Sequence, residues 1–146
     1  MFKSIKLNFM MAITLISPVW ADSFMVSSTD MTEGEFMSKA QEFSGFGCSG
    51  KDLSPHLKWS NPPADTKSFA ITAYDPDAPT GSGWWHWQVV NIPITVDEVV
   101  TGAGSADKSG LPEGSMQIKN DYGVKGFGGA CPPIGHGVHH YRFTVH

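Results

Sequence analysis

Apolar and polar side chains alternate along residues 68–74, where Phe69, Ile71 and Ala73 share one face of an extended chain. A period of two predicts a β-strand, because successive side chains of a strand point to opposite faces. The other face carries Ala70, Thr72 and Tyr74, so it is also largely apolar. A strand covered on both faces is expected in a domain of two packed layers.

Residues 84–92 give a second period-two pattern, with His86, Gln88 and Val90 on one face and Trp85, Trp87 and Val89 on the other. This segment is predicted to be a long central strand. The intervening Thr80-Gly81-Ser82-Gly83 is predicted to be a flexible connection, since glycine and serine favour turns.

The last segment, residues 139–146, also alternates. His139, Tyr141, Phe143 and Val145 share one face. A histidine and a tyrosine in line with two apolar residues are predicted to point inward, where an unsatisfied polar atom is costly. The segment is therefore expected to be a strand that supplies donors to a pocket.

The remaining segments are predicted to be short strands and connections. Residues 56–59 form a short strand between proline turns, residues 32–42 a loop or short strand, and residues 96–113 a surface connection rich in glycine and serine. With 16 glycines and 10 prolines in 146 residues, the pattern is typical of an all-β domain with little helix.

The N-terminal residues 1–21 are predicted to be a secretory signal peptide. Lys3 and Lys6 precede a short apolar run that ends at small residues, as signal cleavage requires. Residues 22–146 would then form a single exported domain, expected in the periplasm. The chain has a net charge of −4, which becomes −6 once the two lysines are removed. This charge argues against nucleic-acid binding, and no stable membrane insertion is expected after cleavage.

Two cysteines, Cys48 and Cys131, would meet an oxidising compartment after export. Two interpretations remain open at this point. The cysteines form a disulfide, or they are buried free thiols, because sequence spacing does not show whether their Cβ atoms meet.

Candidate chemistry lies in two distant segments that join proline turns to histidines. The first holds Asp75-Pro76 and then His86, and the second holds Gly129, Pro132 and then His139 with Tyr141. Prolines stiffen a backbone and glycines allow close approach, so together they can surround a ligand with donors. The structural alternatives are a turn carboxylate at Asp75 and core histidines. A metal site among the C-terminal histidines is not expected, because His139 and His140 point to opposite faces.

Along these residues the chain resembles the phosphatidylethanolamine-binding protein family, also called Raf kinase inhibitor-like proteins, in its exported enterobacterial branch. The resemblance is carried by the following motifs: Cys48-Ser49-Gly50, Leu53-Ser54-Pro55, Asp75-Pro76-Asp77-Ala78-Pro79, Trp84-Trp85-His86-Trp87, Val90-Asn91-Ile92-Pro93, Gly129-Ala130-Cys131-Pro132-Pro133 and residues 139–143. It implies a Greek-key β-sandwich with a small anion-binding pocket at one end.

The resemblance also implies which residues bind the ligand. They are Asp75, Pro76, His86, Gly129, Pro132, His139 and Tyr141. Two departures stand out. His140 replaces an arginine common in the family, and the chain stops at His146 where relatives continue into a C-terminal helix. The domain is accordingly expected to be C-terminally incomplete.

The function expected from this resemblance is binding of a phosphate-like anion or a phosphoethanolamine head group, without a cofactor or metal, and modulation of a protein partner in the envelope or host. A homodimer is a further expectation. The alternatives are a hydrolase or lyase that uses Asp75 and His86 as an acid/base pair, and a nonfunctional truncated fragment. The non-enzymatic interpretation is preferred because no nucleophile is identified by a Gly-x-Ser-x-Gly motif.

Overall fold

The structure is a computed structural model that describes residues 23–107 and 110–146. The predicted signal peptide lies outside the described residues. Within them the ordered elements are strands, and no helix is present. The strands are β1 (Met25–Ser27), β2 (Ser44–Gly45), β3 (Cys48–Ser49), β4 (Leu57–Ser60), β5 (Ser68–Asp75), β6 (Trp84–Pro93), β7 (Glu98–Val99), β8 (Met116–Gln117) and β9 (Arg142–Val145). The predicted all-β class is confirmed.

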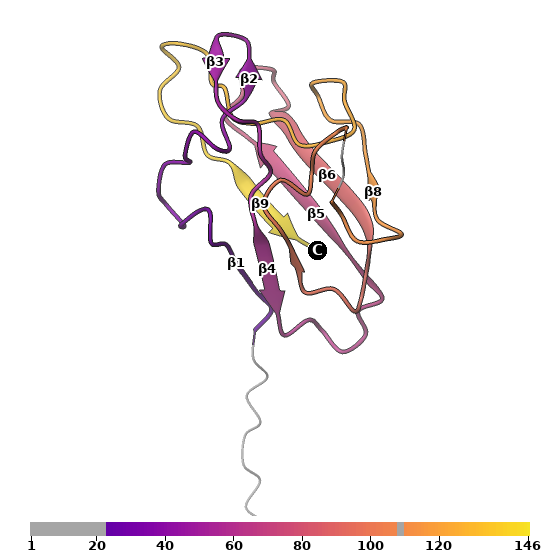
Figure 1. Ribbon diagram of the computed structural model, residues 1–146. Helices are drawn as coiled ribbons and strands as arrows, with labels where there is room; N and C mark the ends of the chain where they lie inside the picture. The colour runs from indigo at the N-terminus through magenta and orange to yellow at the C-terminus, as the bar shows by residue number, and fades with distance from the viewer. Residues whose placement is uncertain (1–22, 108–109) are drawn as a thin grey trace, which may run out of the picture.

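Two antiparallel sheets form the layers of the sandwich (Figure 1). The smaller sheet has the order β1-β4-β7, and the larger one has the order β8-β6-β5-β9. A separate hairpin, β2–β3, lies at one end of the molecule. The two long strands predicted from alternation, β5 and β6, are the central pair of the larger sheet. The short strand predicted at residues 56–59 is β4, displaced by one residue.

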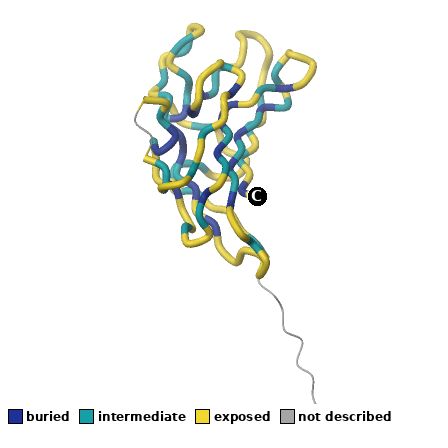
Figure 2. Tube along the Cα trace, turned by 90° about the vertical axis from the view of Figure 1, so that its right-hand side faces the viewer, coloured by how far each residue is buried: buried dark blue, intermediate teal, exposed yellow. Residues whose placement is uncertain are grey.

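The core lies between the sheets, and Figure 2 shows the buried positions gathered in the middle of the molecule. Trp59 of β4 meets Phe69 of β5 edge-on, with ring centroids 5.2 Å apart. On the larger sheet Trp87 packs edge-on against Phe127. Aromatic pairs of this kind stabilise a core beyond the area they bury. The first pair joins the two sheets, and the second packs the loop that contains Phe127 onto the larger sheet.

Strict alternation along β6 was the wrong prediction. Ala73 pairs with Trp87 but Tyr74 pairs with Trp85, so His86 is an extra residue on its strand, a β-bulge. The bulge lets the consecutive residues His86 and Trp87 both be buried, while Trp85 is exposed. A β-bulge redirects one side chain without ending the sheet, and here that side chain is a histidine.

The segment 96–113 was also predicted incorrectly. It contains β7, and Val99 and Ala103 are each only 2% exposed in the core. Glycines and serines around these two residues hid their burial in the sequence. In the C-terminal segment the paired strand begins only at Arg142, but the less exposed positions remain His139, Tyr141, Phe143 and Val145, as the alternation predicted.

Cys48 and Cys131 are joined in a disulfide, with their Cα atoms 6.0 Å apart. The bond ties the β2–β3 hairpin to the loop that precedes β9 and closes a loop of 83 residues. Within the described ranges, no helix is long and apolar enough to cross a membrane.

Candidate functional site

Asp75 ends the central strand β5 and is 3% exposed. Its Oδ2 atom is 2.7 Å from Nδ1 of His139, and its Oδ1 atom accepts a hydrogen bond from the backbone nitrogen of Asp77. Since a carboxylate accepts, Nδ1 of His139 carries a proton and donates. The pair fixes the tautomer and orientation of the ring, with its Nε2 atom on the opposite side.

A second histidine–carboxylate pair lies beside the first. The Oδ2 atom of Asp77 accepts hydrogen bonds from the backbone nitrogen and from Nδ1 of His140, both at 2.7 Å. These hydrogen bonds from His140 lower the pKa of the Asp77 carboxyl. Unlike the buried pair, this one is solvent-exposed, as expected for a residue that faces away from Tyr141. It anchors the backbone next to His139.

His86, at the bulge of β6, is 4% exposed. Its Nδ1 atom lies 2.7 Å from the carbonyl oxygen of Gly128, so Nδ1 is the protonated nitrogen. Burial lowers the pKa of His86, and the hydrogen bond to Gly128 and the negative charge of Asp75 oppose that shift only in part. The ring is therefore neutral near pH 7, with Nδ1 engaged by the protein as in His139.

This pKa shift predicts a pH dependence of stability. The ordinary pKa of histidine is 6.5. As the pH falls below this value, His86 takes up a proton more readily in the unfolded chain than in the folded protein, so the free energy of unfolding decreases. In His86→Asn the amide can still donate to Gly128 but does not titrate. We expect the variant to lose less stability than the wild type between about pH 7 and about pH 5 in urea denaturation.

His146→Asn is the matched control, because His146 is exposed and its ring contacts the hydroxyl of Thr72 at the surface. It is expected to follow the pH dependence of the wild type. An unchanged dependence in His86→Asn would show that burial does not oppose protonation at this position.

Two tyrosines enclose the ring of His86. Tyr141 meets it edge-on at 5.1 Å, and Tyr122 does so at 5.6 Å. Burial raises the pKa of both tyrosine hydroxyls, and the charge of Asp75 contributes to both shifts. Both hydroxyls therefore stay protonated at physiological pH. The Tyr122 hydroxyl donates to the carbonyl of Gly129, so Tyr141 is the tyrosine that can donate to a ligand.

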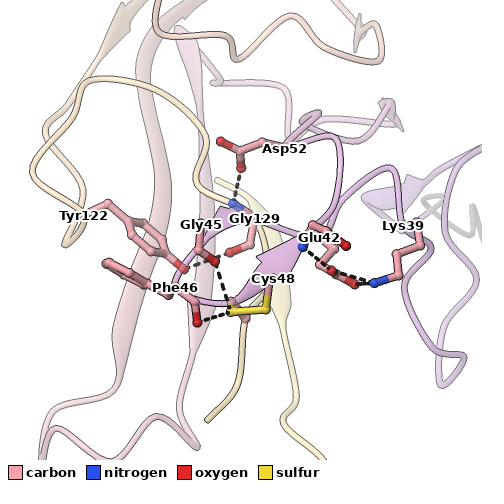
Figure 3. Close-up of a disulfide and its surroundings, with 10 residues drawn as sticks. Lys39, Glu42, Gly45, Phe46, Cys48, Asp52, Tyr122 and Gly129 are labelled. Atoms are coloured by element: carbon pink, nitrogen blue, oxygen red, sulfur yellow. Dashed lines mark hydrogen bonds and ion pairs between the residues drawn. A yellow bond between two sulfur atoms is a disulfide. The ribbon is translucent and has the colours of Figure 1, made fainter. Parts of the chain in front are cut away.

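The segment around Gly129 forms another wall of the site. Its backbone nitrogen donates to Oδ1 of Asp52 at 2.6 Å, and its carbonyl accepts from the hydroxyl of Tyr122 at 2.8 Å. Figure 3 shows Asp52 directed at that nitrogen and Tyr122 beside Phe46 of the β2–β3 hairpin. Burial raises the pKa of the Asp52 carboxyl, and the Gly129 hydrogen bond opposes this.

The structure brings together four of the predicted ligand residues, Asp75, His86, His139 and Tyr141, through the contacts above. Gly129 adjoins them through Gly128, and Pro76 follows Asp75 directly. Pro132 is exposed in the loop before β9. In the hypothesised Asp75/His86 acid/base pair, Oδ2 of Asp75 bonds to His139, and the charge of Asp75 acts on His86 without a hydrogen bond.

Two aromatic residues near these groups were not among the predicted ligand residues. They are Tyr122 and Trp84. The indole Nε1 of Trp84 is buried and has no hydrogen-bond partner among the described residues. Trp84 pairs with Asp75 across the sheet and packs edge-on against Tyr122. A buried donor without a partner next to Asp75 and Tyr122 can donate to a ligand oxygen.

A surface hollow of about 470 Å³ lies next to Tyr122, and its lining also includes Phe43, Phe46 and Asp52. The ring of Tyr122 thus lines the hollow and also contacts His86. Among the residues that the structure describes, no group of three or more histidines, cysteines or acids is placed to hold a metal ion.

Comparison with known proteins places this geometry in context. Residues 27–146 match the profile of the family described as "Phosphatidylethanolamine-binding protein". The chain is 56% identical over 125 residues to the UPF0098 protein YbcL of Escherichia coli K12, covering 86% of this chain and 68% of the relative. It is 48% identical over 119 residues to the UPF0098 protein YbhB of the same organism, covering 82% of this chain and 74% of the relative.

The fold agrees with a solved relative. The crystal structure of E. coli YbcL, described as a new member of the mammalian PEBP family, superposes with a TM-score of 0.82. The match covers 84% of this chain and 74% of that chain. The predicted Greek-key sandwich of this type is thereby confirmed. None of these descriptions denotes an enzyme.

Proposed function

This chain belongs to the phosphatidylethanolamine-binding protein family, and from this premise we propose that it is a periplasmic protein that binds a phosphate-type anion or a phosphorylated head group. The binding groups are the two imidazoles and the hydroxyl of Tyr141. Asp75, Pro76, Gly129 and Pro132 shape the surrounding backbone. A cofactor plays no part in this proposal.

The observation that carries the proposal is the shared arrangement of the two histidines. In each ring the protein engages Nδ1, through Asp75 for His139 and through Gly128 for His86. Each Nε2 atom is then the nitrogen that a ligand meets. An anion favours the charged form of an imidazole, and in that form both Nε2 atoms donate to ligand oxygens. Ligand binding is therefore expected to take up protons.

Binding without covalent catalysis also agrees with the sulfur chemistry. Cys48 and Cys131 are the two cysteines of the chain, and the disulfide uses both. Neither is a thiolate nucleophile. The alternative is a hydrolase or lyase that uses Asp75 and His86 as an acid/base pair. Turnover of a phosphomonoester that is lost in His86→Asn would favour it.

The direct test is calorimetric titration with inorganic phosphate and with O-phosphoethanolamine near pH 6.5, repeated in buffers of different ionisation enthalpy. We expect saturable binding with net proton uptake. His86→Asn and His139→Asn should each weaken affinity by about tenfold or more, the effect of losing a hydrogen bond to a charged group. Tighter binding of O-phosphoethanolamine would identify a head group, and equal binding a free phosphate.

His146→Asn serves as the control, because it removes an imidazole from the opposite end of β9. Its affinity should equal that of the wild type. Well-folded protein that shows no binding of either ligand would contradict the anion site. Equal weakening in the control would point to a general loss of positive charge instead.

Export and protein partners are further parts of the proposal. We expect residues 1–21 to be removed, so that the N-terminus of protein recovered from the periplasm is Asp22. Intact-mass measurement checks this directly. We also propose modulation of an envelope or host partner and association as a homodimer. A monomer by light scattering at working concentration would dispose of the homodimer.

A further inference from the structure

Two turns at the same end of the molecule present apolar side chains at their tips. In the β2–β3 hairpin, Gly45 pairs with Cys48, so Phe46 and Gly47 form a two-residue loop. In the loop before β9, the nitrogen of His136 donates to the carbonyl of Pro133, which puts Ile134 at the tip of a β-turn. Phe46 is 81% exposed and Ile134 is fully exposed. Turn tips ordinarily carry glycine, asparagine or aspartate.

The backbone at Phe46 adds a second signal. Its φ angle is +55°, in the left-handed region that favours glycine or asparagine and that a bulky residue adopts only at a cost. The exposed ring packs against Phe43 and Tyr122, with ring centroids 5.3 Å and 5.8 Å away. A bulky residue in a strained backbone conformation at an exposed turn tip is unfavourable for the fold, and such features concentrate at functional surfaces.

The two tips are held as one unit. The Cys48–Cys131 disulfide joins the hairpin to the loop two residues after Phe46 and three residues before Ile134. Figure 1 shows the β2–β3 hairpin and the loop before β9 at the same end of the molecule. Because the disulfide fixes the spacing of the two loops, the loops need little additional ordering when both side chains contact a partner. This lowers the entropic cost of binding.

The charge pattern indicates what these tips contact. Residues 43–50 and 126–138 contain no Asp, Glu, Lys or Arg. Lys39 and Lys51 are next to each other at the base of the hairpin, where the nitrogen of Lys51 donates to the carbonyl of Lys39. The side chain of Lys39 is paired with Glu42, so the base of the hairpin adds little net positive charge. Apolar tips with uncharged flanks can enter the boundary between lipid tails and head groups without burying a charge.

We propose that Phe46 and Ile134, with the disulfide between their loops, form a docking element that inserts into the surface of a phospholipid bilayer. Two narrow convex tips suit a deformable layer, whereas a protein interface needs a contiguous face of about 800 Å² on each partner. The net charge of −4 makes attraction to anionic lipid weak, so apolar insertion carries the docking. It does not depend on the anion site.

The test is flotation of the protein with vesicles of phosphatidylcholine at millimolar lipid. We expect weak, reversible binding, below the roughly 10⁴ M⁻¹ of a single myristoyl chain, and little change with added salt. Phe46→Asn and Ile134→Asn should each lower the partition coefficient by about tenfold to a hundredfold, the worth of one buried apolar side chain. Asparagine tolerates the left-handed backbone at position 46, so this variant keeps the fold.

Phe36→Asn is the matched control. Phe36 is 85% exposed but lies next to Glu35 in another loop, so its loss should leave vesicle binding unchanged. Excess inorganic phosphate should leave vesicle binding unchanged, which separates docking from anion binding. Absence of vesicle binding, or equal loss in Phe36→Asn, would overturn the proposal. Self-association that both tip variants abolish, without vesicle binding, would assign the tips to a second copy of the chain.

Discussion

Replacing Cys48 and Cys131 by alanine is expected to lower the free energy of unfolding by about 4 to 5 kcal/mol, the value of the chain-entropy model for a loop of this length. The disulfide closes a loop of 83 residues, which is more than half of the chain. Without it, the unfolded chain gains the conformations that the link excluded. Since single domains have only about 5 to 15 kcal/mol of stability, this is a large share.

Urea denaturation of the double variant measures the effect, with reduced wild-type protein as an independent comparison. Both should unfold at lower urea with similar midpoints. The dependence on urea should steepen, because the unlinked unfolded chain exposes more surface. A loss below about 1 kcal/mol would mean that other contacts already restrain the unfolded chain.

The fold is predictable from the sequence where pattern and burial coincide. In β5 the residues with alternate spacing, Phe69, Ile71 and Ala73, are the buried ones. The prediction failed in β6, because a bulge depends on how the partner strand is paired and leaves no local signal. It also failed at Val99 and Ala103, which belong to the core cluster, because membership of the core depends on long-range packing.

The sequence predicted which residues form the candidate site, but it did not predict which of their side chains contact one another. Asp75, His86, His139 and Tyr141 were identified from turns, alternation and family resemblance, and they lie together. Which histidine meets Asp75 depends on a contact between residues 64 positions apart. Tyr122 was missed because its segment has no periodicity, although an aromatic residue between glycine-rich turns would have been a usable signal.

A methyl group at Gly129 is expected to be the most damaging small change near the site. An added Cβ would lie 2.4 Å from the carbonyl oxygen of Gln41 and 2.5 Å from the nitrogen of Phe43. Both are backbone atoms, so relief requires the two segments to separate. That separation would strain the bridge between Glu42 and Ala130 and the hydrogen bond from Gly129 to Asp52. We expect Gly129→Ala to lose about 3 kcal/mol, at the upper end for overpacking.

Gly110→Ala is the matched control, because an added Cβ there would meet its nearest atom, the Cα of Ala103, at 3.4 Å, an ordinary contact. Thermal unfolding of the two variants separates steric overlap from the general effect of losing a glycine. Because Gly128 holds the ring of His86, displacement of this segment should also weaken phosphate binding in Gly129→Ala. Full stability of that variant would mean that the close approach of residues 41–43 and 128–130 is dispensable for the fold.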